Sequence, residues 1–357
     1  MVLGTWGLVL GVKWLVNSEV NCCEERPRRH LPNLKPTAST LCLVAEDQEW
    51  VEPSPRTTHH PQARILPLVT IIALCHNHAP FLIEALDSVA AQTYPHLEVW
   101  LVDNGSTDGS VAMLQAYAAA HPTWRLLLLP ENLGNCRAFN QAFWQSQGEF
   151  VVDFATDDVL LPERLSQQVA LFARLPADYG MVYSNCELLT EAGQPLGLYH
   201  LHDGPGGLDV QPCPASGWVF GEVLRRYFIC TPTMLMRRAC LAALGGYDER
   251  LSYEDFDFWV RASRDWRFQY QDVVTTRKRK HPRSLSAQTT RYHDPHLAST
   301  LAVCQKALAL CHTRAERRAL AGRLGYELGH ALRRRQWPEV RLAARLLVQV
   351  VGRVVGG

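Results

Sequence analysis

Residues 148–161 read GEFVVDFATDDVLL, a run typical of a buried strand that ends in two adjacent carboxylates, Asp157 and Asp158. The segment 149–156 is rich in Val and Phe, which favours a strand of a parallel sheet that is covered on both faces. Pro162 follows, and proline is well tolerated in the first turn of a helix. We therefore expect both carboxylates at the carboxyl end of a parallel strand, where open α/β sheets bind their ligands.

Strand and helix patterns alternate before this stretch. Apolar runs with strand composition lie at 68–74, 97–102 and 124–129. Each run is followed by a helix-like spacing of apolar residues, at 81–90, 110–120 and 136–147. Such close alternation predicts a parallel sheet with right-handed crossovers. Asn77 and Asp103 follow the first two runs, so we expect them at the same edge of the sheet as Asp157 and Asp158.

The second half of the chain is less regular. The pattern predicts a helix at 162–175, a less buried strand at 180–189 and a Gly- and Pro-rich loop at 200–214. It then predicts a helix near 220–227, an extended piece at 232–236 and a helix that ends at 245–246. A helix that begins near 254 follows, and then a strand and a basic loop before 286. Beyond residue 294 it predicts two or three amphipathic helices. We expect three regions: an irregular extension (1–66), a catalytic domain (67–293) and a cationic helical region (294–357).

Composition excludes several classes of protein. The chain has 357 residues, is 47% hydrophobic and carries a formal net charge of +1, so it has material for a large core and no global charge that would favour nucleic acid. Eleven cysteines include no C-x-x-C pair. This pattern indicates a reducing compartment without structural zinc and predicts a cytoplasmic protein.

The two ends of the chain raise the question of membrane contact. The apolar segment 1–16 contains Lys13 and is shorter than the ~20 residues that cross a bilayer. It also lacks the basic start of a secretory signal. The segment 314–357 holds ten Arg against three Glu. Its amphipathic pattern fits peripheral contact with the cytoplasmic face of a membrane. It fits equally well an apolar face that packs on the rest of the chain or on a second subunit, with the arginines in water.

Four ordered blocks resemble the family 2 glycosyltransferases of the GT-A fold. They are VTIIALCHNHAPFLIEALDSVAAQTYPHLEVWLVDNGSTDGS (69–110), ENLGNCRAFNQAF (131–143), FATDDVLLPERL (154–165) and YEDFDFWVR (253–261). The resemblance runs from about residue 68 to residue 286. It implies an α/β fold with a mostly parallel central sheet sandwiched by helices, here with an α-helical C-terminal extension. It also implies an inverting, metal-dependent transfer of a sugar from a UDP-, GDP- or dTDP-sugar to an acceptor hydroxyl of a glycan, glycolipid or polysaccharide precursor.

The resemblance implies roles for individual residues. Asp103 matches the carboxylate that binds the nucleotide base. His76 and Asn77 match residues that line the nucleotide pocket. The block that borders the base and ribose contains Asn132, Gly134 and Arg137. Many family members have Tyr-Asn where this chain has His76-Asn77, so the stacking role of His76 does not follow from the resemblance.

The remaining matched residues belong to the reaction centre. Asp157 matches the carboxylate near the ribose and sugar, and Asp158 the one that holds Mg²⁺ or Mn²⁺ on the diphosphate. Asp255, preceded by Glu254, matches the general base, and His281 lies in a basic loop that approaches the diphosphate. The chemistry needs such groups, because a cation offsets charge on the leaving phosphate and a carboxylate takes the proton of the acceptor hydroxyl.

Two other functions are compatible with part of this pattern. A nucleotidyltransferase with a similar sheet would need a Gly-rich basic phosphate loop after the first strand, and CHNHAP (75–80) has neither Gly nor Lys. A catalytically inactive nucleotide-sugar-binding protein would not need both Asp158 and Asp255. Each residue also has a structural alternative, such as capping a helix (Asp157, Asp158), placement at a helix dipole (Glu254, Asp255) or a solvated surface (Arg137, His281).

Overall fold

The computed structural model of the chain describes residues 66–200, 214–288 and 294–355. Nearly all of the predicted N-terminal extension and most of the predicted Gly- and Pro-rich loop lie outside these residues. All of the described residues fall within one compact unit, which includes the C-terminal region expected at 294–357. The described part is therefore the part in which the expected site lies.

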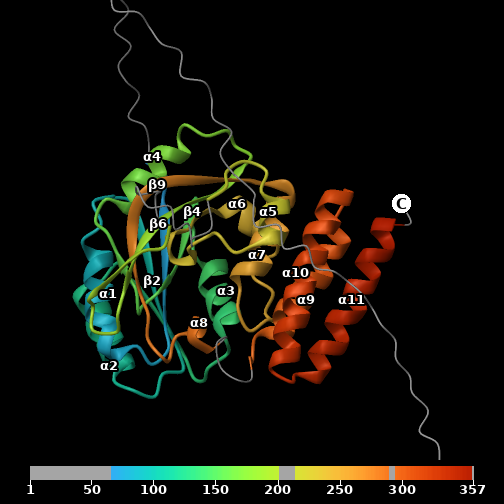
Figure 1. Ribbon diagram of the computed structural model, residues 1–357. Coiled ribbons are helices and arrows are strands. Elements are labelled where there is room, and N and C mark those ends of the chain that lie inside the picture. Colours follow the sequence, from blue (N-terminus) through green and yellow to red (C-terminus); the bar gives the residue numbers. More distant parts are fainter. Residues whose placement is uncertain (1–65, 201–213, 289–293, 356–357) are drawn as a thin grey trace, which may run out of the picture. The chain divides into compact units, whose positions relative to one another are not determined.

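The first half of this unit is the alternating parallel structure that the sequence predicts (Figure 1). The strands are β1 (Val69–Cys75), β2 (Leu97–Asn104), β3 (Arg125–Leu129) and β4 (Phe150–Ala155). The helices between them are α1 (Ala79–Ala90), α2 (Ser110–Ala120) and α3 (Asn135–Gln145). β1 pairs in parallel with both β2 and β4, and β2 pairs in parallel with β3. This is the open α/β arrangement that places strand ends along one edge.

The second half adds a mixed extension to the sheet, whose full strand order is β3-β2-β1-β4-β8-β6-β9-β5, with β7 paired to β6. The added strands are β5 (Val159–Leu160), β6 (Tyr179–Leu189), β7 (Pro195–Leu198), β8 (Leu235–Arg237) and β9 (Arg267–Arg279). β6 and β9 are parallel, whereas β8 runs antiparallel to both β4 and β6. The predicted α/β class is confirmed, but antiparallel pairs are concentrated in this half.

The prediction that the strand near 180–189 is less buried was wrong. β6 lies between β8 and β9, and most of its residues are buried. Its polar side chains find partners inside the sheet: Ser184 Oγ lies 2.5 Å from Thr275 Oγ1, and Asn185 Nδ2 donates to the His200 carbonyl. The polar alternation therefore reflects internal hydrogen bonding and not exposure to water.

Helices cover both faces of the sheet. Leu82 of α1 and Leu165 of α4 (Arg164–Phe172) pack with Ile71 on one face. On the other face, Ile72 shares a core with Phe139 of α3 and Phe258 of α7. The remaining helices are α5 (Phe220–Arg225), the 3₁₀ turn η1 (Thr231–Thr233), α6 (Arg238–Ala243), α7 (Asp255–Asp265) and α8 (Leu285–Gln288). The predicted helix–sheet–helix layering is thus present, and the predicted basic loop is instead largely the end of β9.

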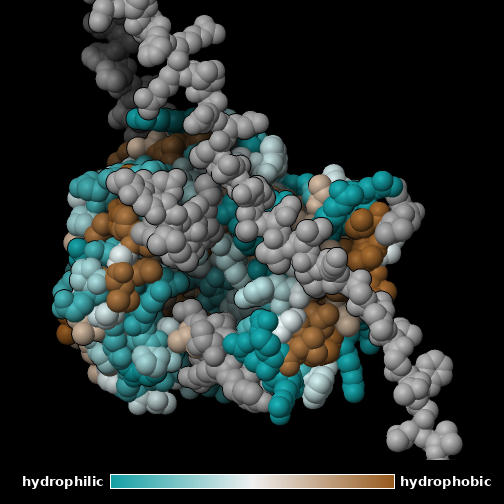
Figure 2. Space-filling view, viewed as in Figure 1, coloured by the Kyte–Doolittle hydropathy of each residue, from teal (hydrophilic) through white to brown (hydrophobic). Residues whose placement is uncertain are grey.

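The C-terminal region forms three helices, α9 (Leu297–Leu310), α10 (Arg314–Arg333) and α11 (Trp337–Val355) (Figure 1). α10 packs on α5, and α9 packs on α7. In α11, Ala343, Leu346 and Val350 are buried in the main core, so its apolar face packs within this chain. Val348 is 72% exposed, and hydrophobic residues show at the surface over these helices in Figure 2. Among the described residues, no helix has both the length and the apolar character needed to span a membrane.

Candidate active site

The pairing register brings the ends of three parallel strands together. Cys75 pairs with Asp103, and Leu74 pairs with Ala155, two residues before Asp157. The turn after β4 is tied to the turn after β1, because His78 Nδ1 lies 3.0 Å from Thr156 Oγ1. The sequence-predicted residues that follow β1, β2 and β4 therefore share one edge of the sheet.

A hydrogen-bonded network joins His76, Asn104 and Asn132 at this edge. His76 Nδ1 lies 2.8 Å from the Asn104 carbonyl oxygen, and His76 Nε2 lies 3.1 Å from Asn132 Nδ2. Asn104 Nδ2 in turn donates to Asn132 Oδ1 at 3.0 Å, and that oxygen also accepts from the Gly134 N–H. The imidazole is thus fixed in orientation, and the turn that begins α3 is fixed to the end of β2.

Asp103 and Asn77 hold the turn after β2. Asp103 is 1% exposed, and its Oδ2 accepts the Ser106 N–H at 2.9 Å. Its Oδ1 is buried and has no hydrogen-bond partner among the described residues. Asn77 has a left-handed backbone (φ 59°), and its Oδ1 accepts from the Thr107 N–H at 2.8 Å. A buried carboxylate oxygen left unpaired is costly, so Asp103 Oδ1 has spare capacity for a ligand donor.

Arg137 is placed differently from the other predicted pocket residues. It extends from α3, is half exposed, and its Nε lies 3.2 Å from Glu249 Oε2. An exposed pair of this kind contributes little to stability. Its side chain can therefore change partners without a large cost to the fold.

Asp157 and Asp158 are buried together after β4, and each is held by residues at or just after the end of β9. Asp157 Oδ2 lies 3.0 Å from His281 Nε2. Asp158 Oδ1 accepts the Arg279 backbone N–H at 2.8 Å, while Arg279 Nε donates to the Asp157 carbonyl. His281 itself packs against Phe81, with 5.0 Å between ring centroids. Arg279 and His281, which lie 121 to 124 positions later in the sequence, therefore fix the orientation of the acidic pair.

The two carboxyl groups differ in their electrostatics. Burial, reinforced by the negative charge of Asp157, raises the pKa of Asp158 well above its ordinary value. Burial also acts to raise the pKa of Asp157, but the hydrogen bond from His281 and the nearby imidazoles outweigh it and hold that pKa below its ordinary value. Asp157 is therefore ionised at neutral pH, whereas a positive charge beside Asp158 would favour its ionisation.

The donor set suits a hard divalent cation that shares its ligands with phosphate. Asp157 Oδ1 is a buried carboxylate oxygen, and the described residues offer it no hydrogen bond. Mg²⁺ and Mn²⁺ prefer such oxygens, and Mg²⁺ often takes only one or two carboxylates with substrate phosphates completing its shell. No group of three or more His, Cys, Asp or Glu in the described ranges is arranged to hold a metal by itself. A cation here would therefore depend on its substrate for ligands.

Glu254 and Asp255 lie at the start of α7. Asp255 Oδ2 accepts from Thr231 Oγ1 at 2.8 Å, and Oδ1 accepts the Phe256 N–H at 2.6 Å. Glu254 is 9% exposed, and its Oε2 accepts from Asn135 Nδ2. Burial, with added repulsion from Asp153 and Asp255, raises the pKa of Glu254 to about 8, and burial also raises the pKa of Asp255.

Lys278 connects the two acidic groups. It lies on β9 next to Arg279, and its positive charge acts on both Asp158 and Asp255 to lower their pKa values against the dominant effect of burial. Burial lowers the pKa of Lys278, but the surrounding negative groups outweigh this and raise it overall. The carboxylates that follow β4 and begin α7 are thus both under the influence of the same positive charge.

Sequence reasoning missed several residues that shape this site. Thr231 and Lys278 carry no local signal, because a threonine near a Pro and a lysine in a basic run are common on surfaces. Asp153 is different: it interrupts the apolar strand FVVDFA, and burial raises its pKa to about 7. A carboxylate within a buried strand is rare enough to have been a usable signal.

Comparison with known proteins shows similarity to glycosyltransferases over part of the chain. Residues 70–194 match the family model described as glycosyl transferase family 2. An uncharacterised glycosyltransferase of Rickettsia typhi is 25% identical over 228 residues, which is 63% of this chain and 66% of that protein. The chain therefore spans slightly less than two thirds of that relative.

Two further proteins extend the comparison. The putative teichuronic acid biosynthesis glycosyltransferase TuaG of Bacillus subtilis is 29% identical over 130 residues, which cover 36% of this chain and 51% of TuaG. The crystal structure of S. aureus TarS (residues 1–349) with UDP-GlcNAc superposes with a TM-score of 0.55 at 20% identity, and the match covers 72% of this chain and 71% of TarS. Residues 70–194 are thus similar to the family 2 glycosyltransferases, and the described part of the chain has the GT-A fold.

Proposed function

We propose that the protein transfers a sugar from a nucleoside-diphosphate sugar to an acceptor hydroxyl, with inversion at the anomeric carbon and with the help of a divalent cation. The observation that carries this proposal is the presence of two separate acidic groups, the pair Asp157 and Asp158 held by the end of β9 and Asp255 held by Thr231, with the positive charge of Lys278 acting on both Asp158 and Asp255. Such a transfer requires a site for a cation and a group that accepts a proton. The carboxylate pair suits the first, and the separate carboxylate suits the second.

The nucleotide is expected at the ends of β1 and β2. Asp103 Oδ1 would accept a hydrogen bond from the base, because it is a buried acceptor that the described residues leave unpaired. His76, Asn132 and Gly134 form the fixed wall beside it. The half-exposed Arg137 would reach the ribose or phosphate side by exchanging its contact with Glu249.

The diphosphate and cation are expected at Asp157 and Asp158. A bound Mg²⁺ or Mn²⁺ would supply positive charge to the phosphate oxygens as the bond from the anomeric carbon to the diphosphate breaks. Asp157 and Asp158 would hold it, and His281 would keep Asp157 in its present orientation. The raised pKa of Asp158 is consistent with this role, since the residue lacks a full counter-charge in the protein alone.

Asp255 is the proposed general base. In a single displacement the acceptor oxygen forms a bond to the anomeric carbon, its proton passes to a carboxylate oxygen of Asp255, and the nucleoside diphosphate leaves on the opposite face. Asp255 is partly accessible at the helix start, and Thr231 orients it. Glu254 is buried and, with a pKa of about 8, mostly protonated at neutral pH, which favours Asp255 over Glu254 for this role.

For the acceptor and the cellular location, we propose only a chemical class and a general compartment. TuaG is named for teichuronic acid biosynthesis and TarS was crystallised with UDP-GlcNAc, which supports a glycan or lipid-linked polysaccharide acceptor and a UDP-sugar among the candidate donors. The exposed arginines of α10 and α11 leave open peripheral contact with an anionic membrane surface at the cytoplasmic face.

The test combines donor binding with turnover. Thermal unfolding is measured with UDP-, GDP- and dTDP-sugars, each with and without Mn²⁺, because a ligand that binds the folded state raises the melting temperature. Release of nucleoside diphosphate from the best donor is then compared between the parent, Asp255→Asn and a control, Asp265→Asn, which changes an exposed residue of the same helix. The proposal predicts that Asp255→Asn keeps donor binding and loses turnover at least 100-fold.

Other outcomes would point to other functions. Donor binding without turnover in the parent would indicate a nucleotide-sugar-binding protein. Turnover that survives Asp255→Asn would exclude Asp255 as the base, and stabilisation by nucleoside triphosphates alone would favour a nucleotidyltransferase.

A further inference from the structure

A buried arginine from the C-terminal helices lies against the start of α7. The guanidinium carbon of Arg323, in α10, lies 4.0 Å from the ring centroid of Tyr227 and 4.7 Å from that of Phe256, the residue after Asp255. Arg323 is 6% exposed, and its Nε lies 3.5 Å from Oε1 of Glu327, one helical turn away. Stacking on aromatic faces is favourable for arginine and fixes the plane of the guanidinium.

Part of the hydrogen-bonding capacity of the Arg323 guanidinium is left without a partner in the part of the chain that the structure describes. Its Nε and Nη2 atoms are buried and lack a hydrogen-bond acceptor among the described residues. A buried charge with unused donors is costly to the fold, so packing alone is a poor explanation for an arginine at this position. Its positive charge acts on the Asp255 carboxylate, in the direction that favours ionisation.

The C-terminal helices also hold the residues just before Asp255. The Ser252 N–H donates to Ser299 Oγ at 3.0 Å, and Tyr253 OH lies 2.6 Å from Thr300 Oγ1. Ser299 and Thr300 belong to α9. The segment that carries Asp255 is thus bound by α9 on its N-terminal side and contacted by Arg323 of α10 on its C-terminal side.

We propose that Arg323 is a positioning residue for sugar transfer: its stacked guanidinium fixes the first turn of α7 and supplies the buried positive charge that orients and stabilises the Asp255 carboxylate. This inference rests on the proposed role of Asp255. It gives the C-terminal helices, which lie outside the matched segment 70–194, a part in the reaction beyond packing.

Arg323 acts within a larger set of charged and titratable groups around Asp255. The others are Asp153, Tyr199, Tyr227, Tyr253, Glu254, Lys278 and His296. Lys278 is the other positive group, but it also faces Asp158 and Cys230. Burial lowers the pKa of His296, so this residue adds little positive charge at neutral pH. Arg323 is therefore the cation whose removal changes Asp255 without changing the acidic pair.

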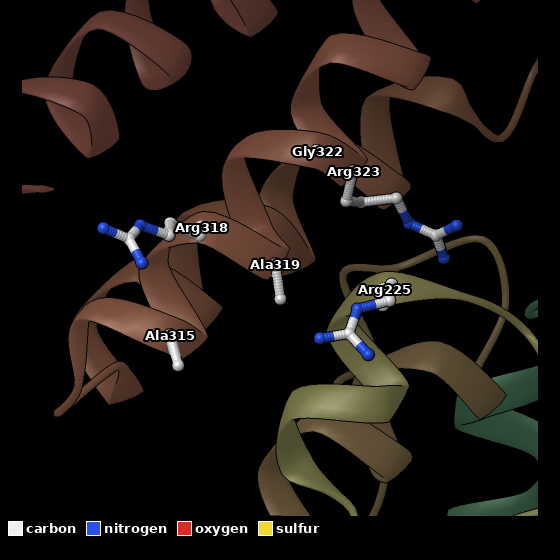
Figure 3. A pocket seen from close by; sticks show the side chains of 6 residues that line it. All are labelled: Arg225, Ala315, Arg318, Ala319, Gly322 and Arg323. Atoms are coloured by element: carbon white, nitrogen blue, oxygen red, sulfur yellow. The ribbon is translucent and has the colours of Figure 1, made fainter. Parts of the chain in front are cut away.

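The same helix offers a matched control. Arg318 and Arg323 line a hollow between α10 and α5, with Arg225 on the α5 side. Figure 3 shows the Arg318 and Arg323 side chains pointing in opposite directions from α10. Arg318 is exposed, so Arg318→Met makes the same chemical change on α10 without removing a buried charge.

The test is a double-mutant cycle read by thermal unfolding between pH 4 and pH 9. The four proteins are the parent, Asp255→Asn, Arg323→Met and the double variant. Because burial raises the pKa of Asp255, ionising this group costs stability as the pH rises, and Asp255→Asn relieves that cost. Without Arg323, ionising Asp255 should cost more stability, and the full cost should be reached only at a higher pH than in the parent.

We expect Asp255→Asn to raise the melting temperature more in the Arg323→Met background than in the parent, and equally in the parent and in Arg318→Met. An identical effect of Asp255→Asn in both the parent and the Arg323→Met protein at every pH would overturn the inference. This readout needs no activity, so turnover that survives Asp255→Asn would remove the proposed function without altering the result of the cycle.

A second variant still tests the inference if Arg323→Met does not fold. Glu327→Gln removes the negative charge that faces Arg323 and keeps the side-chain shape. It should shift the acid limb of nucleoside diphosphate release to lower pH, whereas Arg323→Lys should leave the limb near that of the parent. If Arg323 had only a structural role, the acid limb in Glu327→Gln would stay where it is in the parent. That result would also overturn the inference.

Discussion

Thr231 Oγ1 lies 2.8 Å from Asp255 Oδ2, so a short 3₁₀ turn holds a carboxylate at the start of a helix 24 residues later. The turn is itself fixed by Arg164, whose Nη1 donates to the Pro232 carbonyl at 2.6 Å and whose Nη2 donates to the Met234 carbonyl at 2.8 Å. Arg164 is 1% exposed. The orientation of Asp255 thus depends on contacts that run from α4 through η1.

Thr231→Val should move the acid limb of the pH–rate profile to higher pH. The hydroxyl stabilises the ionised carboxylate, and burial already raises the pKa of Asp255, so losing this hydrogen bond should raise that pKa further. The base is then ionised only at higher pH. The measurement is release of nucleoside diphosphate between pH 5 and pH 9. Thr231→Ser keeps the hydroxyl and should match the parent, and equal profiles for Val and Ser would contradict the prediction.

Asp158→Asn should remove the Mn²⁺-dependent part of donor binding. The amide oxygen can still accept the Arg279 N–H, so the local fold is retained, but a neutral amide is a much weaker cation ligand than a carboxylate. The measurement is the rise in melting temperature that the donor produces with and without Mn²⁺. Asp265→Asn should behave as the parent, and an unchanged Mn²⁺ effect in Asp158→Asn would assign the cation to other residues.

Glu254→Gln should stabilise the protein increasingly as the pH rises. The pKa of Glu254 is raised from 4.5 to about 8 in the folded state, first by burial and then by repulsion from Asp153 and Asp255. Below pH 4.5 the group is protonated in both states and costs nothing. Between pH 4.5 and 8 the unfolded state ionises first, so the parent loses stability across that window, on the order of 5 kcal/mol in total.

The measurement for this prediction is urea unfolding of the parent and Glu254→Gln at pH 4.5 and pH 8. The advantage of the Gln variant should be present at pH 8 and small at pH 4.5. Glu131→Gln, at an exposed position, should show no such dependence. A constant difference between parent and Glu254→Gln at both pH values would mean that Glu254 ionises normally.

Local pattern was sufficient for the parallel half of the fold. The strand 69–75 and the helix 110–120 were predicted within a residue of their bounds, since apolar runs and turn residues there agree with the final packing. The acidic pair and the turns after β1 and β2 were placed correctly at one edge because parallel strands end there. The burial of β6 was not predictable, because it depends on pairing with β9, in which Arg267 pairs with Tyr179 and Arg279 with Leu189.

Long-range partners were also beyond sequence reasoning. Thr231 reaches Asp255, and Arg279 reaches Asp158, only after the mixed half of the sheet has formed. Lys278 and Arg323 look like ordinary surface cations in the sequence, and only the fold brings their charges to act on Asp255. Asp153 was the exception, because its position inside an apolar strand was visible in the sequence and was not used.

Gly105→Ala should weaken nucleotide binding by distorting the wall of the base pocket. Gly105 has φ 67°, and a Cβ atom there would lie 2.3 Å from the Glu131 backbone carbon and 2.4 Å from the Asn132 backbone nitrogen. The turn at 131–134 would have to move away from β2, which would break the contact of Asn132 with Asn104. We expect a loss of about 1–3 kcal/mol of stability and a higher KM for the donor, with a smaller effect on kcat.

Gly197→Ala is the matched control for this last prediction. Gly197 also has a positive φ, at 122°, but a Cβ atom there would meet nothing within 4 Å. It lies on β7, which pairs with β6 outside the main strand order. Backbone strain without a clash should therefore lower the melting temperature and leave the KM for the donor unchanged. If both variants raised KM equally, general strain and not displacement of Asn132 would be the cause.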